Sequence, residues 1–172
     1  MKIYKVVIIG DTLSGKTSLL YRYLPLDWRS HGKHHILGWD IETMHINMPK
    51  FNEKIRVDFW EIVGDHKSYS PKFFEKFYNK VNGIMLVFDV GNPKTFKNLS
   101  FWINQIKKYI DYEVPGILIG NKIDISPRKI SSTQGQEYAD KIGFGYIGTS
   151  AKQIINVKDA FDYIIKELMR IF

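Results

Sequence analysis

The sequence of 172 residues contains no cysteine. Disulfides, thiolate metal sites and cysteine-linked lipid anchors are therefore excluded within this chain. No apolar run approaches the roughly 20 residues that a membrane-spanning helix needs, and the N-terminus lacks a signal-peptide pattern. We also find no internal repeat, no low-complexity tract and no linker. We expect one domain over residues 1–172, a monomer in the cytoplasm that reaches membranes only through partners.

The composition that remains is typical of a globular protein. Hydrophobic residues make up 44%, aromatic residues 15% and charged residues 25% of the chain, which argues against disorder. The formal net charge of +7 favours anionic partners such as nucleotide phosphates, acidic proteins, anionic lipid or nucleic acid. A nucleic-acid-binding module is the weaker alternative, because the sequence has no RNP-type, zinc or helix-turn-helix pattern. We therefore expect no nucleic-acid partner.

Short apolar runs alternate with helical patterns along the chain. Continuous runs rich in β-branched residues are typical of parallel strands that are covered on both faces. The runs are Ile3–Ile9, Ile84–Val90, Ile117–Ile119 and Tyr146–Ile147. Helices are predicted over residues 92–110, after the capping box formed by Ser131 and Gln134, and after the potential cap Asn156.

One segment alternates apolar with polar residues instead of forming a continuous apolar run. Ile41–Met48 and Ile55–Phe59 predict two antiparallel strands joined by a turn at Pro49–Glu53. Strand–helix alternation with one such hairpin predicts an α/β fold of the doubly wound kind. We expect a six-stranded, mostly parallel sheet with one antiparallel edge strand and about five helices.

A complete phosphate-loop motif, G-x-x-x-x-G-K-[ST], follows the first predicted strand. Gly10 and Gly15 let the backbone curl so that its N–H groups face phosphates at a helix N-terminus. Lys16 would reach the β- and γ-phosphates, and the Thr17 hydroxyl would ligate Mg²⁺. A glycine-rich turn with an unrelated lysine is the alternative. The candidate phosphate-binding residues are Gly10, Asp11, Thr12, Leu13, Ser14, Gly15, Lys16, Thr17 and Ser18.

A second motif predicts that the nucleotide carries guanine. The segment Asn121–Asp124 follows the strand at Ile117–Ile119, where ligands of such sheets bind. The carboxylate of Asp124 can accept hydrogen bonds from guanine N1–H and the 2-amino group, which adenine does not offer. A kinase or ATPase is therefore disfavoured. The candidate guanine-binding residues are Asn121, Lys122, Asp124, Ser150, Ala151 and Lys152.

These motifs carry a resemblance that spans Lys2 to Phe172. The chain resembles a Ras-superfamily small GTPase of the Rab-like branch, and Phe77–Ile84 is most similar to the divergent Rab-like three subgroup. The resemblance implies the P-loop small-GTPase fold, GTP or GDP and Mg²⁺ as ligands, and a role in vesicle trafficking or signalling. It also implies that Trp28 packs against guanine and that Gly64 lies near the phosphates.

Both switch segments depart from the pattern of that family. The first family switch reads Thr-Ile-Gly-x-Asp-Phe, so the magnesium-binding threonine is here Ile36, or His35 if the gap falls elsewhere. Neither has a hydroxyl to ligate a hard cation. In the second switch, Glu61 keeps a carboxylate that would hold Mg²⁺ through water, and Asp65 replaces the water-orienting glutamine. A carboxylate beside the phosphoryl group is electrostatically adverse.

Two interpretations of the altered switches remain. In one, the chain is an active GTPase that cycles with exchange and activating partners, and His34, His35 or His66 takes a missing role. In the other, which we favour, the chain binds guanine nucleotide and hydrolyses it very slowly, or acts as a nucleotide-loaded scaffold. Leu13 also replaces a small residue and would crowd the space used by an activating arginine. The candidate catalytic residues are Lys16 and Asp65.

The resemblance further implies effector and regulator proteins as partners, bound through the switches. The matching partner-binding positions are Ile41, Trp60 and Phe77, which would form a hydrophobic patch with a polar rim. The alternative is that Trp60 and Phe77 are core residues. A basic cluster could hold phosphate, anionic lipid or an acidic partner, or could simply be solvated. It consists of Arg29, His31, Lys33, His34 and His35.

Overall fold

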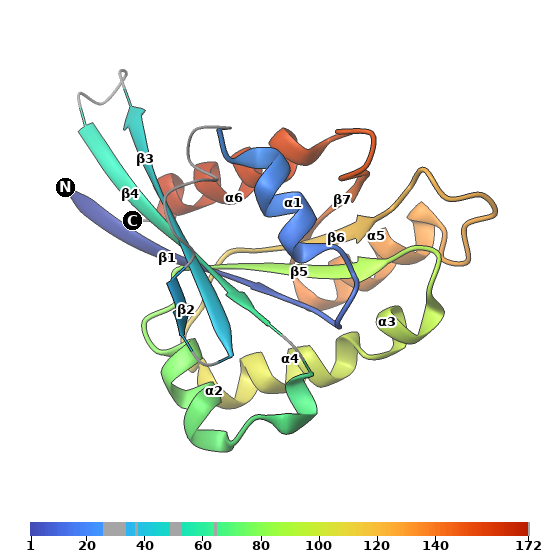
Figure 1. The fold of residues 1–172 in the computed structure, drawn as a ribbon, viewed down its shortest axis with the longest axis horizontal. Coiled ribbons are helices and arrows are strands. Elements are labelled where there is room, and N and C mark those ends of the chain that lie inside the picture. The colour runs from blue at the N-terminus through green and yellow to red at the C-terminus, as the bar shows by residue number, and fades with distance from the viewer. Residues whose placement is uncertain (26–33, 37, 49–52, 64, 172) are drawn as a thin grey trace.

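The computed structural model describes residues 1–25, 34–36, 38–48, 53–63 and 65–171 (Figure 1). These residues form one sheet in the strand order β2-β3-β4-β1-β5-β6-β7. The strands are β1 (Lys2–Ile9), β2 (His34–Ile36), β3 (Trp39–Met48), β4 (Glu53–Ile62), β5 (Gly83–Asp89), β6 (Gly116–Asn121) and β7 (Gly145–Thr149). The helices are α1 (Lys16–Tyr23), α2 (Pro71–Tyr78), α3 (Pro93–Lys97), α4 (Leu99–Tyr109), α5 (Ser132–Ile142) and α6 (Val157–Ile171), and a 3₁₀ turn, η3, covers His66–Ser68.

The predicted mostly parallel sheet with one antiparallel strand is confirmed. Within the described part of the chain, β3 is antiparallel to both of its neighbours, β2 and β4, whereas β1, β4, β5, β6 and β7 pair with one another in parallel. Beyond the six predicted strands, the three-residue β2 pairs with β3, so the sheet has seven strands and β3 does not form its edge. The turn predicted at Pro49–Glu53 lies mostly outside the described residues.

Local signals explain where several helices begin. The Asn92 side chain accepts a hydrogen bond from the Lys94 N–H (3.2 Å) at the start of α3. Ser131 and Gln134 form the predicted capping box before α5. The helix predicted over residues 92–110 is divided at Asn98, whose side chain is directed into a contact with the phosphate loop.

Helices cover both faces of the sheet with apolar side chains. Figure 1 shows α1 and α6 on one face, and α2, α3 and α4 on the other. Phe161 of α6 stacks on Tyr23 of α1 with ring centroids 4.2 Å apart, and Phe77 and Trp102 fill the opposite core. Because β1, β5, β6 and β7 are parallel, their carboxyl ends meet at one edge. No helix among the described residues is long and apolar enough to cross a membrane.

Candidate functional site

The phosphate loop connects the end of β1 to the start of α1, so Gly10–Ser18 lie at the carboxyl edge of the sheet. Gly10 and Gly15 have φ angles of 142° and 97°. A Cβ atom at Gly10 would lie 2.1 Å from the Val87 carbonyl oxygen, and one at Gly15 would lie 2.2 Å from Nδ2 of Asn121. Both positions therefore require glycine for conformation and for space.

Lys16, the first residue of α1, is buried in this loop. Its ammonium donates to the carbonyl oxygens of Gly10 and Asp11, at 3.1 Å each. Burial lowers the pKa of Lys16, and the carboxylates of Glu61 and Asp11 oppose that shift. The hydroxyl of Ser14 is also buried, and it has no hydrogen-bond partner among the described residues. A buried ammonium and an unsatisfied hydroxyl fit the oxygens of a bound phosphate.

Two oxygen-bearing side chains meet beside Lys16. The Thr17 hydroxyl on α1 donates a hydrogen bond to the buried carboxylate of Glu61 on β4. Hydroxyl and carboxylate oxygens suit Mg²⁺, which usually takes few protein ligands and completes its shell with phosphate oxygens and water. The donor set therefore fits a magnesium ion shared with a nucleotide. The side chain of Ile36 lies outside what the structure describes, so the predicted loss of a ligand there stays a prediction.

Beside α1 a pocket of 570 Å³ opens at the same sheet edge. Asn121 organises one side of it: its Nδ2 donates to the Ser14 carbonyl (3.0 Å), and its Oδ1 accepts from the Thr149 hydroxyl (3.1 Å) and the Ala151 N–H (3.3 Å). This buried amide joins the phosphate loop to β6 and β7. The pocket is lined by Gly15, Ser18, Tyr21, Arg22, Asn121, Lys122, Asp124, Ile125, Ala151 and Lys152.

Asp124 lines that pocket with a carboxylate that stays ionised. The Ser150 hydroxyl donates to Asp124 Oδ1 at 2.6 Å. This hydrogen bond, with smaller contributions from the charges of Lys152 and Lys122, lowers the pKa of Asp124 below its ordinary value. An ionised carboxylate accepts hydrogen bonds only, which is the chemistry that guanine N1–H and its amino group require.

Lys122 spans from the end of β6 to the phosphate loop. Its ammonium donates to the Leu13 carbonyl (2.7 Å) and to Asp89 Oδ2 (2.6 Å), and its φ angle is 68°. The aliphatic stem is therefore stretched across the pocket with both ends fixed. The partner Asp89 was not among the predicted site residues. Asp89 is a lone carboxylate within the apolar run Ile84–Val90, at the carboxyl end of β5, and this is a signal in the sequence that points to it.

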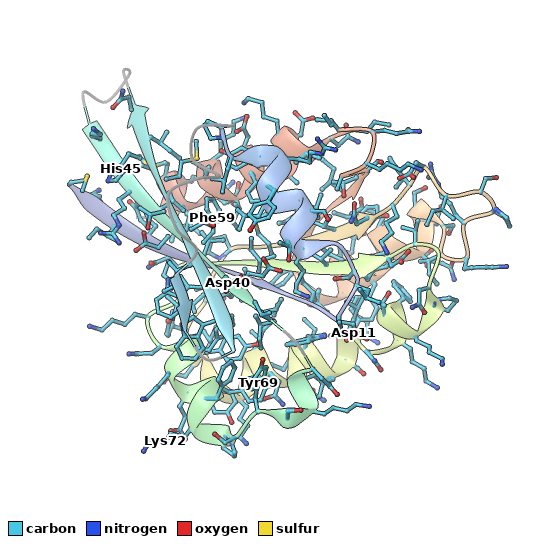
Figure 2. The ribbon with its side chains drawn as sticks, in the orientation of Figure 1. Asp11, Asp40, His45, Phe59, Tyr69 and Lys72 are labelled. Carbon is cyan, nitrogen blue, oxygen red and sulfur yellow. The ribbon has the colours of Figure 1, made fainter. Side chains whose placement is uncertain are left out.

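The sequence gives no sign of the contact that anchors the phosphate loop to α4. The Asp11 carboxylate accepts hydrogen bonds from Nδ2 of Asn98 (2.7 Å) and from the indole N–H of Trp102 (2.9 Å). Figure 2 shows Asp11 beside α3 and α4. The Asp11 side chain therefore holds the phosphate loop against α4.

The predicted catalytic position Asp65 is exposed and directly precedes the turn η3. Its carboxylate accepts a hydrogen bond from the Lys67 N–H (3.1 Å), and its carbonyl accepts one from the Ser68 N–H (3.0 Å). Leu13 is 83% exposed at the mouth of the site. Trp28, Gly64 and the basic residues Arg29, His31 and Lys33 lie outside the described residues, as do the side chains of His34, His35 and His66.

The two switch segments contact each other through aromatic rings. Gly38 has a φ angle of 96°, and a Cβ there would lie 2.4 Å from the Phe73 ring. Trp39 packs on Phe73 with ring centroids 4.8 Å apart. Tyr69, labelled in Figure 2, stacks on Phe73 and donates a hydrogen bond to the Val63 carbonyl. These contacts join the start of β3 to the segment after β4.

The predicted partner-binding residues do not all reach the surface. Ile41 and Trp60 are half-buried, and their strands pair at this point. Phe77 is fully buried, so the prediction that it lies in a surface patch is not met in this conformation. The spacing of apolar residues in α2 directs Phe77 into the core together with Phe74. Phe77 thus has the position that the alternative interpretation assigns to it.

Lys5 lies over Trp60, with its ammonium 3.8 Å from the ring centroid, and donates to the Asn79 carbonyl (3.1 Å). Burial lowers the pKa of Lys5 from 10.5 to about 8. Between pH 8 and 10.5 the unfolded chain therefore binds more protons at this site, so the contribution of Lys5 makes the folded state more stable as pH rises.

We expect Trp60 fluorescence to change with a midpoint near pH 8 as the ammonium above the ring is neutralised. The measurement is a pH titration of the folded protein, taken as the difference from Lys5→Met, in which the same transition should be missing. A midpoint near the ordinary value of lysine would contradict the described burial of Lys5.

Comparison with known proteins gives a consistent result across the chain. The Ras family model matches residues 5–170. The Ras-related protein RABA2a of Arabidopsis thaliana is 32% identical over 170 residues, which cover 98% of this chain and 76% of that protein. The Ras-related protein Rab-8B of Homo sapiens is 30% identical over 97% of this chain and 79% of its own length. The Ras-related protein RabC of Dictyostelium discoideum is 28% identical over 96% of this chain and 84% of its own length. The chain therefore belongs to the Ras family of small GTPases, on its Rab-like branch.

Proposed function

We propose that the protein is a guanine-nucleotide-dependent switch of vesicle trafficking or signalling, with weak or atypical GTP hydrolysis. Residues 1–172 would act as one nucleotide-binding domain. Buried Lys16 and ionised Asp124 lie at the two ends of one site, and the hydrogen bonds of Asn121 join those ends. This arrangement is the observation that carries the proposal. A similarity to Rab-named proteins supports the trafficking role.

Each group of the site has a distinct task in this proposal. Lys16 and the N–H groups of the loop would bind the phosphates, while Asp124 would select guanine by accepting two hydrogen bonds. Thr17, with Glu61 through water, would hold a magnesium ion, which supplies neutralising charge at the phosphates when bound. Asn121 would keep the phosphate and guanine ends in register, because it bonds to residues of both.

The direct test is the nucleotide carried by the purified protein, with the affinity for GDP and GTP measured in the presence and absence of Mg²⁺. We expect copurified guanine nucleotide and tighter binding with Mg²⁺. ATP that remains bound in excess GTP would contradict the guanine assignment. An empty site, with no measurable affinity for either nucleotide, would favour a scaffold that does not switch.

Weak hydrolysis follows from the chemistry at Asp65. Its carboxylate cannot donate a hydrogen bond to the transferring phosphoryl group, and its negative charge opposes the charge that develops there. It also already accepts the Lys67 N–H at the start of η3. A glutamine at this position would supply an amide donor at greater reach and without charge.

We expect Asp65→Gln to raise the single-turnover rate of GTP hydrolysis by about tenfold or more, because one well-placed donor is worth roughly 10²- to 10³-fold in enzyme oxyanion holes. The gain should stay below that range, since Ile36 also departs from the family pattern. Asp65→Asn is the matched control: it removes the same charge but its amide reaches one methylene less far.

GDP affinity should be unchanged in both Asp65 variants, because this side chain is exposed outside the pocket and GDP has no γ-phosphate for its charge to oppose. Wild-type hydrolysis at rates usual for the family, with no change in Asp65→Gln, would support the competing proposal of an active GTPase with non-standard switch residues.

A further inference from the structure

One part of the sheet combines lysines with exposed apolar surface. We call it the basic face, and it consists of Lys5, Lys54, Arg56, Asp58, Lys76 and Lys80. Strand register places Lys5 of β1 beside Asp58 of β4, and side-chain alternation puts Lys54, Arg56 and Asp58 on the same side of β4. Lys76 and Lys80 come from the end of α2 and the residues after it. In Figure 1 the start of β1 and the far half of the β3–β4 hairpin extend beyond α2.

The charge of the basic face is strongly positive. Asp58 is its one carboxylate, and it already accepts hydrogen bonds from Nε of Arg56 (2.8 Å) and from the Thr43 hydroxyl (2.7 Å). The Arg56–Asp58 pair therefore cancels its own charge. The charges of Lys5, Lys54, Lys76 and Lys80 are left to act on a partner, and the last three side chains are exposed.

The centre of this face is a hollow in which two apolar side chains lie among polar and charged ones. A pocket of 470 Å³ lies between β1, β4 and the end of α2, with Lys5, Lys76 and Lys80 around Trp60 and Ile3. Ile3 is 56% exposed, although it is a large hydrophobic residue. The Lys5 ammonium lies over one face of the Trp60 ring, 3.8 Å from its centroid. An aromatic ring and an aliphatic side chain surrounded by charges are typical of a binding hot spot.

We propose that the basic face binds an acidic segment of a partner protein, with carboxylates on the lysines and one apolar side chain in the hollow against Trp60 and Ile3. The inference rests on the proposed switch function and deepens it, because Trp60 begins the second switch segment and α2 follows that segment in sequence. It extends that surface away from the nucleotide, along β1 and β4. A polypeptide fits better than a bilayer, since one of its side chains can enter the pocket while carboxylates on either side of it meet the lysines.

The probe is a short fluorescent peptide of glutamates around one phenylalanine, compared with its glutamine counterpart by anisotropy. We expect the wild-type protein to bind the glutamate peptide, and Lys76→Glu with Lys80→Glu to weaken that binding by about tenfold or more. The matched control is Lys107→Glu with Lys141→Glu, which reverses two exposed lysines on α4 and α5 and changes the net charge equally. The control should alter affinity less than about twofold.

Several outcomes would overturn the proposal. The first three are no binding of the glutamate peptide to the wild type, an equal loss of affinity in both double variants, and equal binding of the glutamate and glutamine peptides. The last is tighter binding of the protein to phosphatidylserine vesicles or duplex DNA than to the glutamate peptide. GDP affinity is measured on the same samples to separate the two proposals. Peptide binding without GDP binding would overturn the nucleotide switch alone, and GDP binding without peptide binding would overturn the basic face alone.

Discussion

Replacement of Asp124 with asparagine should lower the affinity for GDP and GTP by about 10²- to 10³-fold and raise the affinity for xanthosine nucleotides. The ionised carboxylate can accept from both N1–H and the 2-amino group, and each hydrogen bond to a charged group is worth about 1.5–3 kcal/mol. An asparagine keeps one acceptor and gains a donor, which faces the guanine amino group unfavourably. Xanthine has an oxygen in place of that amino group and accepts from the same donor.

The variant should fold normally, so the loss can be assigned to recognition. Asp124 lies at the pocket wall and not in the core, and an asparagine oxygen can still accept from the Ser150 hydroxyl. The change in base preference is measured by competition, in which GDP or xanthosine diphosphate (XDP) displaces a fluorescent GDP analogue. Ser150→Ala is the control: it removes the hydrogen bond that holds the carboxylate but leaves both acceptors, so the preference for guanine should remain. Equal weakening for GDP and XDP would show that Asp124 does not read the base.

The order of strands and helices could be predicted because each main element carries its own local signal. The run Ile84–Val90 predicts β5, which is buried throughout, and alternation between residues 41 and 59 predicts the β3–β4 hairpin. The strand β2 has only three residues and is joined to β3 through the main chain, so no periodicity could reveal it. The division of one predicted helix at Asn98 depends on Asp11, which is far away in the sequence.

The site, like the fold, has residues that could be predicted from the sequence and contacts that could not. Lys16 and Asp124 could be predicted, because a fixed spacing of residue types around a strand end determines their chemistry. The contacts that hold the site in place connect residues of distant segments, as in the pairs Asp11–Trp102 and Lys122–Asp89. Nothing in the sequence near one member specifies the other. The prediction that Phe77 lies at the surface is not met for a related reason, because the burial of Phe77 depends on the rotation of α2 against the sheet.

Lys16→Met should strongly weaken nucleotide binding while leaving the nucleotide-free protein at least as stable as the wild type. Removing the charged partner of a buried phosphate should cost about 3–5 kcal/mol, which corresponds to roughly 10²- to 10³-fold or more in affinity. In the nucleotide-free protein, by contrast, we expect the Lys16 charge to lower the stability of the fold. Burial disfavours the charged form of Lys16, and its ammonium has two carbonyl oxygens, of Gly10 and Asp11, as hydrogen-bond partners. An apolar side chain of similar length avoids that desolvation cost.

Thermal unfolding with and without GDP and Mg²⁺ separates these two effects. A ligand that binds only the folded state stabilises it in proportion to the logarithm of its concentration over Kd, so the wild type should gain stability with GDP and Lys16→Met should gain much less at the same GDP concentration. Lys107→Met, which removes an exposed lysine on α4, should keep the full gain. If Lys16→Met unfolded at a clearly lower temperature without nucleotide, the bonds to Gly10 and Asp11 would be structural in their own right. The charge of Lys16 would then serve the fold as well as the phosphate, and loss of binding in this variant could not be assigned to the phosphate alone.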